Sequence, residues 1–284
     1  MFDNVKEKLS KNAEMIERAL AAYYDKSDAD YGQLIDSQRY SLLGGGKRIR
    51  AYLVMETCRT LGGDDKAALP YACAIEMVHT YSLIHDDLPC MDNDDERRGK
   101  PTNHKVYGET VALLAGDALL TRAFSVVSSN GELDSNANCK AIKALADAAG
   151  EDGMIGGQTI DVRAAKERID FETLLRLHSL KTGKLICASA ALGCIAAGVS
   201  EDDPRFKAAT EYAKSIGLAF QILDDLLEYG EGEIEKNSFL SFMSADEARE
   251  YAKEITRRGC ESIKEYDADG ALRELAEYLT TRKY

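Results

Sequence analysis

The helical spacing of the apolar residues is the feature that most limits how this chain can fold. Apolar residues recur with helical periodicity over segments of about 12 to 25 residues, separated by short stretches rich in Gly, Asp or Asn. No segment shows the alternation of a β-strand. The pattern predicts an all-α fold with helices at about 2–24, 32–44, 47–61, 67–88, 108–129, 135–149, 151–165, 171–198, 205–229, 244–266 and 268–282.

The chain shows no boundary that would divide it into domains. It has no linker, low-complexity tract or short-period repeat, and its 284 residues, of which 45% are hydrophobic, suffice for one large core. We therefore expect a single domain over residues 1–284. The most loop-like stretches are 89–107 and 229–243, and each follows an aspartate pair.

Composition limits the partners and the compartment. The net charge of -13 argues against nucleic-acid binding, which needs a basic surface. The N-terminal segment mixes charged and apolar residues, unlike a signal peptide, and the longest apolar stretch, 185–199, is too short for a membrane span. Seven cysteines without CxxC spacing fit reduced thiols, so we expect a cytoplasmic protein without a membrane span.

The strongest chemical signal is a cluster of acids where an apolar helix stops. In YSLIHDDLPCMDNDDERRG, Asp86 and Asp87 end the helix, Pro89 interrupts it, and Asp92 follows. On an unbroken helix Asp92 would point away from Asp86, so the interruption is needed for the carboxylates to converge. A second cluster, FQILDDLLEYG, places Asp224 and Glu228 on one helix face.

Clustered carboxylates at the end of an apolar helix repel one another unless a cation neutralises them. Mg²⁺ suits two carboxylate rims that face each other, because it binds a few carboxylates, waters and substrate phosphates. A single Asp pair is more often a solvated helix end, but two pairs beside basic residues favour a site. The basic residues are Lys47 and Arg50 after a glycine turn, Arg97 and Arg98 after the first cluster, and the Lys181–Lys184 patch.

Several motifs together resemble a known family. GGGKRIR, MVHTYSLIHDDLPCMDNDDERRGKPTNH, GDALL, GGQTIDV, HSLKTGKL and FQILDDLLE occur in the order and spacing of the trans-isoprenyl diphosphate synthases (polyprenyl synthetases), most like the bacterial short-chain farnesyl diphosphate synthases. The resemblance implies an isoprenoid-synthase-type helical bundle around a central cavity, usually a homodimer. It also implies a prenyltransferase that condenses isopentenyl diphosphate with an allylic diphosphate, using three Mg²⁺ ions that Mn²⁺ could replace.

The resemblance also assigns roles to residues. Metal binding is implied for Asp86, Asp87, Asp92 and Asp224, catalytic roles for these four and for Lys181, Thr182 and Gln221, and substrate binding for Lys47, Arg50, His79, Arg97, Arg98, Lys181, Phe220 and Gln221. Gln158 and Asp161 resemble a polar pair beside the metal site. Read without the family, Thr182, Gln221 and His79 would each be an ordinary cap or a buried polar group.

Product length is read in this family from the residues one turn before the first cluster, here Tyr81 and Ser82. Helical angles place Ser82 on the face of Asp86 and Tyr81 on its flank, so Tyr81 as the floor of the tail pocket rests on the resemblance. A bulky Tyr81 with the Pro89-Cys90 insertion resembles producers of the C15 chain. The sequence therefore predicts farnesyl diphosphate as product, with geranylgeranyl or geranyl diphosphate as alternatives.

Three departures from the family pattern are visible, and two other functions stay open. The second cluster ends in Glu228, and the following loop is shorter than the family's, with Lys236 matching a later lysine; Ala51 stands where proline is usual. A weakly active or regulatory synthase subunit is thus one alternative, although the intact first cluster counts against it. A class I terpene cyclase is another, although it has no use for the GGGKRIR and RRG strings.

Overall fold

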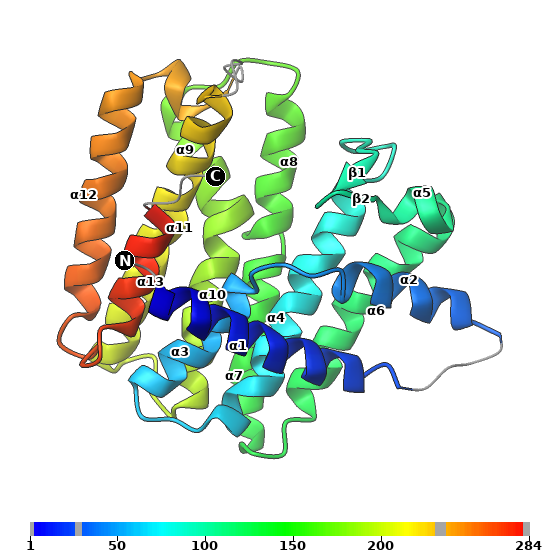
Figure 1. The fold of residues 1–284 in the computed structure, drawn as a ribbon, viewed down its shortest axis with the longest axis horizontal. Helices are drawn as coiled ribbons and strands as arrows, with labels where there is room; N and C mark the ends of the chain where they lie inside the picture. The colour runs from blue at the N-terminus through cyan, green and yellow to red at the C-terminus, as the bar shows by residue number, and fades with distance from the viewer. Residues whose placement is uncertain (1–2, 26–29, 231–236, 281–284) are drawn as a thin grey trace.

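The computed structural model describes residues 3–25, 30–230 and 237–280, without the side chains of residues 3 and 228–230. Helices dominate this part of the chain (Figure 1). They are α1 (Asp3–Ala22), α2 (Gly32–Leu42), α3 (Ile49–Thr60), α4 (Asp65–Asp86), α5 (Asn103–Tyr107), α6 (Glu109–Ser128), α7 (Ser135–Ala149), α8 (Met154–Ala164), α9 (Phe171–His178), α10 (Lys184–Ala196), α11 (Pro204–Gly230), α12 (Ala245–Ile263) and α13 (Ala271–Thr280). The predicted all-α fold is confirmed.

The helix boundaries follow from capping side chains in the sequence. Asp64, Asp134 and Asp170 each accept a hydrogen bond from a backbone N–H in the first turn of α4, α7 and α9. Ser244 and Glu247 form a reciprocal capping box at the start of α12. Each cap stands within three residues of a predicted helix start. The predicted segments therefore agree with the structure to within a few residues.

The structure adds short elements in the two stretches predicted to be loops. Residues Glu96–Arg97 (β1) and Lys100–Pro101 (β2) pair as an antiparallel hairpin, so the expectation of no strand is wrong at this point. Arg98 and Gly99 at its turn have φ of 55° and 71°, the left-handed conformation of a two-residue hairpin turn. Strands of two residues are too short to show alternation. Residues Phe239–Ser241 (η2) form a 3₁₀ turn.

The predicted helix 171–198 is continuous but changes its winding. A π-helical segment, Ser179–Gly183 (η1), lies between α9 and α10. Beyond it nearly every residue of α10 is buried, because this helix contacts α3, α4, α7 and α11. In Figure 1, α4, α8, α10 and α11 run alongside one another and α1 crosses them at a steep angle. The bundle thus encloses an apolar centre, with α10 inside it.

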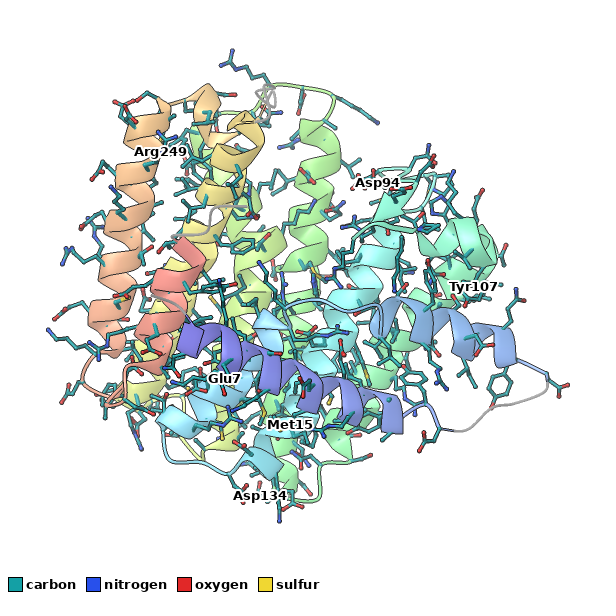
Figure 2. All side chains as sticks on the ribbon, in the orientation of Figure 1. Glu7, Met15, Asp94, Tyr107, Asp134 and Arg249 are labelled. Carbon is teal, nitrogen blue, oxygen red and sulfur yellow. The ribbon has the colours of Figure 1, made fainter. Side chains whose placement is uncertain are left out.

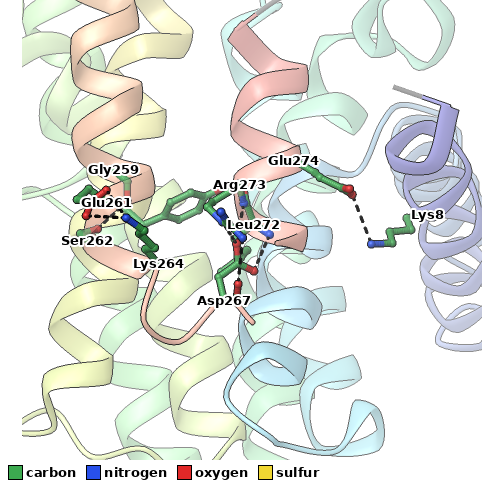
Figure 3. Close-up of polar contacts among 10 residues, drawn as sticks. Lys8, Gly259, Glu261, Ser262, Lys264, Asp267, Leu272, Arg273 and Glu274 are labelled. Carbon is green, nitrogen blue, oxygen red and sulfur yellow. Dashed lines mark hydrogen bonds and ion pairs between the residues drawn. The ribbon is translucent and has the colours of Figure 1, made fainter. Parts of the chain in front are cut away.

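Charged side chains cover the outside of the bundle. Asp94, Asp134 and Arg249 lie at its periphery in Figure 2 and are exposed. Asp267 is an exception, since it is 1% exposed and accepts hydrogen bonds from the backbone N–H groups of Leu272 and Arg273 at 3.2 and 3.0 Å (Figure 3). It therefore caps α13, and the Lys8–Glu274 ion pair at 3.6 Å links that helix to α1.

Two stretches are long and apolar enough to cross a membrane by length and composition alone. They are α6 and the continuous run Phe171–Ala196, and 39% and 61% of their most apolar windows are buried inside the protein. α6 packs against α2, α4, α5 and α7. Core helices of helical bundles meet the same criteria, so these two are weak indications of a span.

Candidate active site

The C-terminal end of α4 carries the first aspartate cluster. The helix ends at Asp86, three residues before Pro89, and the chain then folds back on itself. The backbone N–H of Asp92 donates to the carbonyl oxygen of Asp86 at 2.9 Å. This turn is the interruption expected from Pro89, and it returns Asp92 to the end of the helix beside Asp86.

The electrostatics of Asp86 and Asp92 indicate a place for a cation. Burial, with the charge of Asp92, raises the pKa of Asp86 to about 6, although the ammonium of Lys181 lowers it. Burial likewise raises the pKa of Asp92 against the same lysine. Two partly desolvated carboxylates that repel each other gain by binding a positive charge.

Asp87 is turned away from this pair. Its carboxylate is 3% exposed and accepts a hydrogen bond from Nε of Arg97 at 2.7 Å. Arg97 also reaches Asp94 at 3.5 Å. Asp87 therefore holds Arg97 in place, and its role as a metal ligand stays a prediction.

Lys181 and Thr182 project from the π-helical segment η1. A π-segment inserts a residue into the helix and is frequent at functional sites. Lys181 is ion-paired with Asp161 of α8. The two elements touch closely, because a Cβ added at Gly157 would lie 2.2 Å from the backbone nitrogen of Lys181. Gly157 thus allows α8 to carry Asp161 to the lysine.

The second aspartate cluster stands on α11. Thr182 donates to Oε1 of Gln221 at 2.7 Å, and the amide of Gln221 is 3.5 Å from Oδ2 of Asp224. Asp225 instead accepts a hydrogen bond from the backbone N–H of Phe239 at 2.6 Å, so it anchors η2. The side chain of Glu228 and the whole of Lys236, both singled out from the sequence, lie outside the described residues.

A cleft of about 610 Å³ separates the two acidic rims. Asp92 comes from the first cluster, Asp224 and Asp225 come from the second, and Lys181 and Asp161 lie on the wall. His178 and Gln221 line it as well. Both amide atoms of Gln158, three residues before Asp161 on α8, are buried without a partner in the described part of the chain. The predicted cavity between helices is therefore present.

The basic residues gather at a second place, around His79 of α4. Burial and the charges of Arg50 and Arg98 hold the pKa of His79 well below its usual value, so the ring is neutral at pH 7. Arg98 donates to the carbonyl oxygen of Gly45, and its guanidinium lies against Gly46. The hairpin and the glycine turn before α3 are thereby joined. Lys47 is exposed beside them.

Sequence reasoning did not single out Arg48, which builds this basic region. Its guanidinium is buried and pairs with Glu76 at 3.2 Å and with Glu17 at 3.3 Å. Glu76 also accepts from the backbone N–H of Ala51 at the start of α3. The available signal was Glu76, an acid within the apolar helix predicted at 67–88. A buried acid is nearly always paired, so Glu76 predicted a basic partner.

Tyr81, Ser82 and Phe220 lie in the protein interior. Tyr81 is 5% exposed, and burial raises its pKa to about 12. Ser82 is half-buried and donates to the carbonyl oxygen of His79 at 2.9 Å. Phe220, also half-buried, packs with the apolar cluster of α10 and α11. None of the three lines the 610 Å³ cleft, which holds the polar end of the site.

The donor set suits a metal that binds together with a phosphate ligand. Among the described residues, no three His, Cys, Asp or Glu side chains form a group that could hold an ion alone. Mg²⁺ typically takes one or two carboxylates and completes its shell with water and phosphate oxygens. The Asp86–Asp92 pair and Asp224 fit that requirement.

Comparison with known proteins agrees with this geometry. Residues 33–238 match the polyprenyl synthetase family. A farnesyl diphosphate synthase of Geobacillus stearothermophilus is 44% identical over 82% of this chain and 78% of its own length. The large subunit 1 of an Arabidopsis thaliana heterodimeric geranylgeranyl pyrophosphate synthase is 41% identical over 87% of this chain and 72% of its own.

The fold agrees over the full length of a solved structure. The apo crystal structure of an FPP/GFPP synthase from Zymomonas mobilis superposes with a TM-score of 0.92 at 39% identity, covering 99% of this chain and 100% of the other. A helical bundle with two aspartate clusters across a cleft is the arrangement expected of a prenyltransferase of this family. This chain belongs to the polyprenyl synthetase family.

Proposed function

We propose that this protein is a Mg²⁺-dependent prenyltransferase that condenses isopentenyl diphosphate with dimethylallyl or geranyl diphosphate and gives farnesyl diphosphate. Within the family it is a short-chain prenyl diphosphate synthase, and its relatives divide between C15 and C20 producers. The observation that carries the proposal is the cleft with Asp92, Lys181 and Asp224 on its walls. The charge of Arg97 acts on both Asp86 of this site and His79 of the basic cluster. Both substrates carry a diphosphate, and each region suits one.

The residues of the chain divide the work between the two substrates. Lys181 and Arg97 bind the diphosphate of the allylic substrate, while Lys47, Arg50 and Arg98 bind that of isopentenyl diphosphate. Bound Mg²⁺, for which Mn²⁺ could substitute, supplies charge neutralisation for the departing diphosphate. Thr182 and Gln221 present oxygen atoms near the allylic carbon. Holding two substrates in line replaces a bimolecular encounter by a positioned one.

The C15 product rests on Tyr81. Five residues before Asp86, it lies about 7.5 Å further along the α4 axis, where a bulky ring limits the space for a growing tail. A C20 product is the alternative, because the Arabidopsis relative bears that name. A weakly active or regulatory subunit remains the other alternative from the sequence, and it differs from a synthase in turnover alone.

One experiment tests the proposal. Purified protein is given Mg²⁺, labelled isopentenyl diphosphate and either dimethylallyl or geranyl diphosphate, and the products are separated by chromatography. A C15 product is expected from both starters. The absence of elongation from both would overturn the synthase assignment and favour a regulatory subunit. A C20 product would refute Tyr81 as the floor of the tail pocket.

We further propose that the protein works in the cytoplasm as a homodimer. All seven cysteines are free thiols, which supports a reducing compartment. Leu113 and Leu114 of α6 are 45% and 50% exposed, and this apolar surface supports contact with a second copy.

A further inference from the structure

His85 lies between Asp86 of the metal site and Tyr81 of the tail pocket, and the proposed function gives it no role. It precedes the metal-binding Asp86 and follows Tyr81 by four residues, so its ring and that of Tyr81 share one face of α4. The two rings meet edge to face, with centroids 5.6 Å apart and planes at 79°. This arrangement is one of the favoured geometries of aromatic pairs.

The ring of His85 is held by α6 on its other side. Its Nε2 lies 3.0 Å from the carbonyl oxygen of Leu113, and since a carbonyl can only accept, Nε2 carries the hydrogen. The same nitrogen is 3.9 Å from Oδ1 of Asp117. A backbone carbonyl of a neighbouring helix thus fixes both the tautomer and the direction of the ring.

Gly116 leaves the space that the ring occupies. A Cβ built at Gly116 would lie 2.1 Å from Nε2 and 2.4 Å from Cδ2 of His85, far inside van der Waals contact. No other residue type fits at position 116 while the ring stays in place. His85 and Gly116 therefore set the distance between α4 and α6 at the level of the aspartate cluster.

Tyr81 lies in the main apolar core, and the contact with His85 orients its ring there. Its hydroxyl is buried and has no hydrogen-bond partner in the described parts of the chain, so no polar anchor holds the ring. The side chain is 5% exposed, and among the described residues the edge contact with His85 is its ring–ring interaction. Moving His85 therefore removes one of the groups that pack against the Tyr81 ring.

We propose that His85 and Gly116 determine product length by positioning Tyr81. This inference rests on the proposed function, in which Tyr81 ends the tail pocket. His85 and Gly116 touch no substrate in it. They act through the Tyr81 ring, whose position decides how far an allylic chain can extend along α4.

The test compares product ratios in a double-mutant cycle. His85→Ala, Tyr81→Ala and the double variant are given geranyl diphosphate, isopentenyl diphosphate and Mg²⁺, and the ratio of C20 and longer products to C15 is measured. His85→Ala should raise this ratio at least about fivefold, and the double variant should not exceed Tyr81→Ala alone. An unchanged ratio in His85→Ala, or independent multiplicative effects in the double variant, would overturn the proposal.

The product ratio does not depend on the amount of active enzyme. A slower turnover caused by the substitution next to Asp86 therefore does not obscure it. A wild-type protein that already makes C20 would refute the farnesyl assignment and Tyr81 as the floor of the tail pocket, and this proposal with them, whereas a wild-type protein that makes C15 with an unchanged ratio in His85→Ala would overturn this proposal alone. A wild-type protein that elongates nothing would refute the synthase function itself. The two failures are therefore distinguishable.

Gly116 is tested by the melting temperature, which needs no turnover. Gly116→Ala should lower Tm by about 5 °C in the wild type and by much less in the His85→Ala background, where the overlapping ring is gone. Gly217→Ala is the matched control. Gly217 lies within α11, and a Cβ added there would come no closer than 3.4 Å to its nearest neighbours, Gly183 and Ile186. Equal losses of Tm in both backgrounds would reject the contact between Gly116 and His85.

Discussion

At the scale of residues, the first cluster gains its chemistry from the burial of individual charges. Burial raises the pKa of both Asp86 and Asp92, and Lys181 opposes this rise because its ammonium charge favours the ionised carboxylates. Asp161 holds that lysine at the wall of the cleft. The acidic rim is therefore partly balanced by the protein's own ammonium group.

Replacement of Asp86 tests the metal site directly. Asp86→Ala removes one of the two carboxylates at the end of α4, so turnover should fall by at least about a hundredfold, as when one transition-state contact is lost. The fold should persist, because the side chain is at a helix end. Turnover is measured with labelled isopentenyl diphosphate and helix content by circular dichroism. An unchanged rate would reject the assignment.

His178 gives the protein a sensitivity to acid. Burial lowers the pKa of its ring to about 4, below the ordinary value of 6.5, and the ring stacks on Phe239 at 5.1 Å. The unfolded chain therefore binds a proton before the folded protein does. Stability is complete above pH 6.5 and falls as the pH drops towards 4, by about 2 kcal/mol at pH 5.

A variant without the titrating ring isolates this effect. His178→Phe keeps an aromatic stack on Phe239 and cannot bind a proton, so its free energy of unfolding should lose about 2 kcal/mol less than that of the wild type between pH 8 and pH 5. Urea unfolding at the two pH values measures the difference. Equal losses in both proteins would show that His178 does not titrate in this range.

At the scale of elements, the contact between α8 and η1 positions the basic side of the cleft. The π-segment directs Lys181 to the cleft, and Gly157 lets α8 approach the lysine backbone closely enough for the ion pair with Asp161. The hairpin β1–β2 positions the arginines of the basic cluster around His79, because it places Arg97 against Asp87 and Arg98 against Gly45.

Gly157→Ala should separate these two elements. Its Cβ would lie 2.2 Å from the nitrogen and 2.6 Å from the Cα of Lys181, both backbone atoms that cannot rotate away. We expect a loss of about 1 to 3 kcal/mol in stability, together with a lower kcat from a displaced Lys181. Gly217→Ala serves as the control for adding a methyl group in mid-helix. A Gly157→Ala protein with wild-type Tm and kcat would contradict the role of this contact.

At the scale of the whole molecule, α6 carries an apolar surface that the rest of the bundle does not cover. Its inner residues Ala112, Ala115 and Leu119 are fully buried, while Leu113 and Leu114 are exposed on the other side. The other large apolar side chains that are exposed among the described residues, such as Ile155 and Val162, lie on other elements. An exposed apolar patch favours a protein contact.

Leu114→Arg tests whether α6 pairs with a second copy. A guanidinium buried in an apolar interface lacks a partner, so the mass measured by light scattering should fall from a dimer to a monomer. Ile155→Arg is the matched control, because Ile155 is 48% exposed on a different helix, α8. A dimer that persists in Leu114→Arg would exclude this face as the interface.

The class of fold and the residue types of the site could be predicted from the sequence alone. Helical periodicity and capping residues such as Asp64 and Ser244 are local, so helix positions could be read to within a few residues. The pairs Asp86-Asp87 and Asp224-Asp225 could likewise be identified directly in the sequence. Hairpin β1–β2 and the π-winding at Lys181 were not, because two-residue strands and one inserted residue change no periodicity that can be measured.

The hydrogen-bond partners of the paired aspartates depended on the tertiary structure. Asp87 turns to Arg97 and Asp225 to the backbone of Phe239, and both partners come from later segments of the chain. The buried Arg48–Glu76 pair and the place of His85 against Gly116 depend in the same way on helices distant in sequence. The spacing of residues determines which side chains share one face of a helix. Which helix packs against that face depends on the packing of the whole bundle.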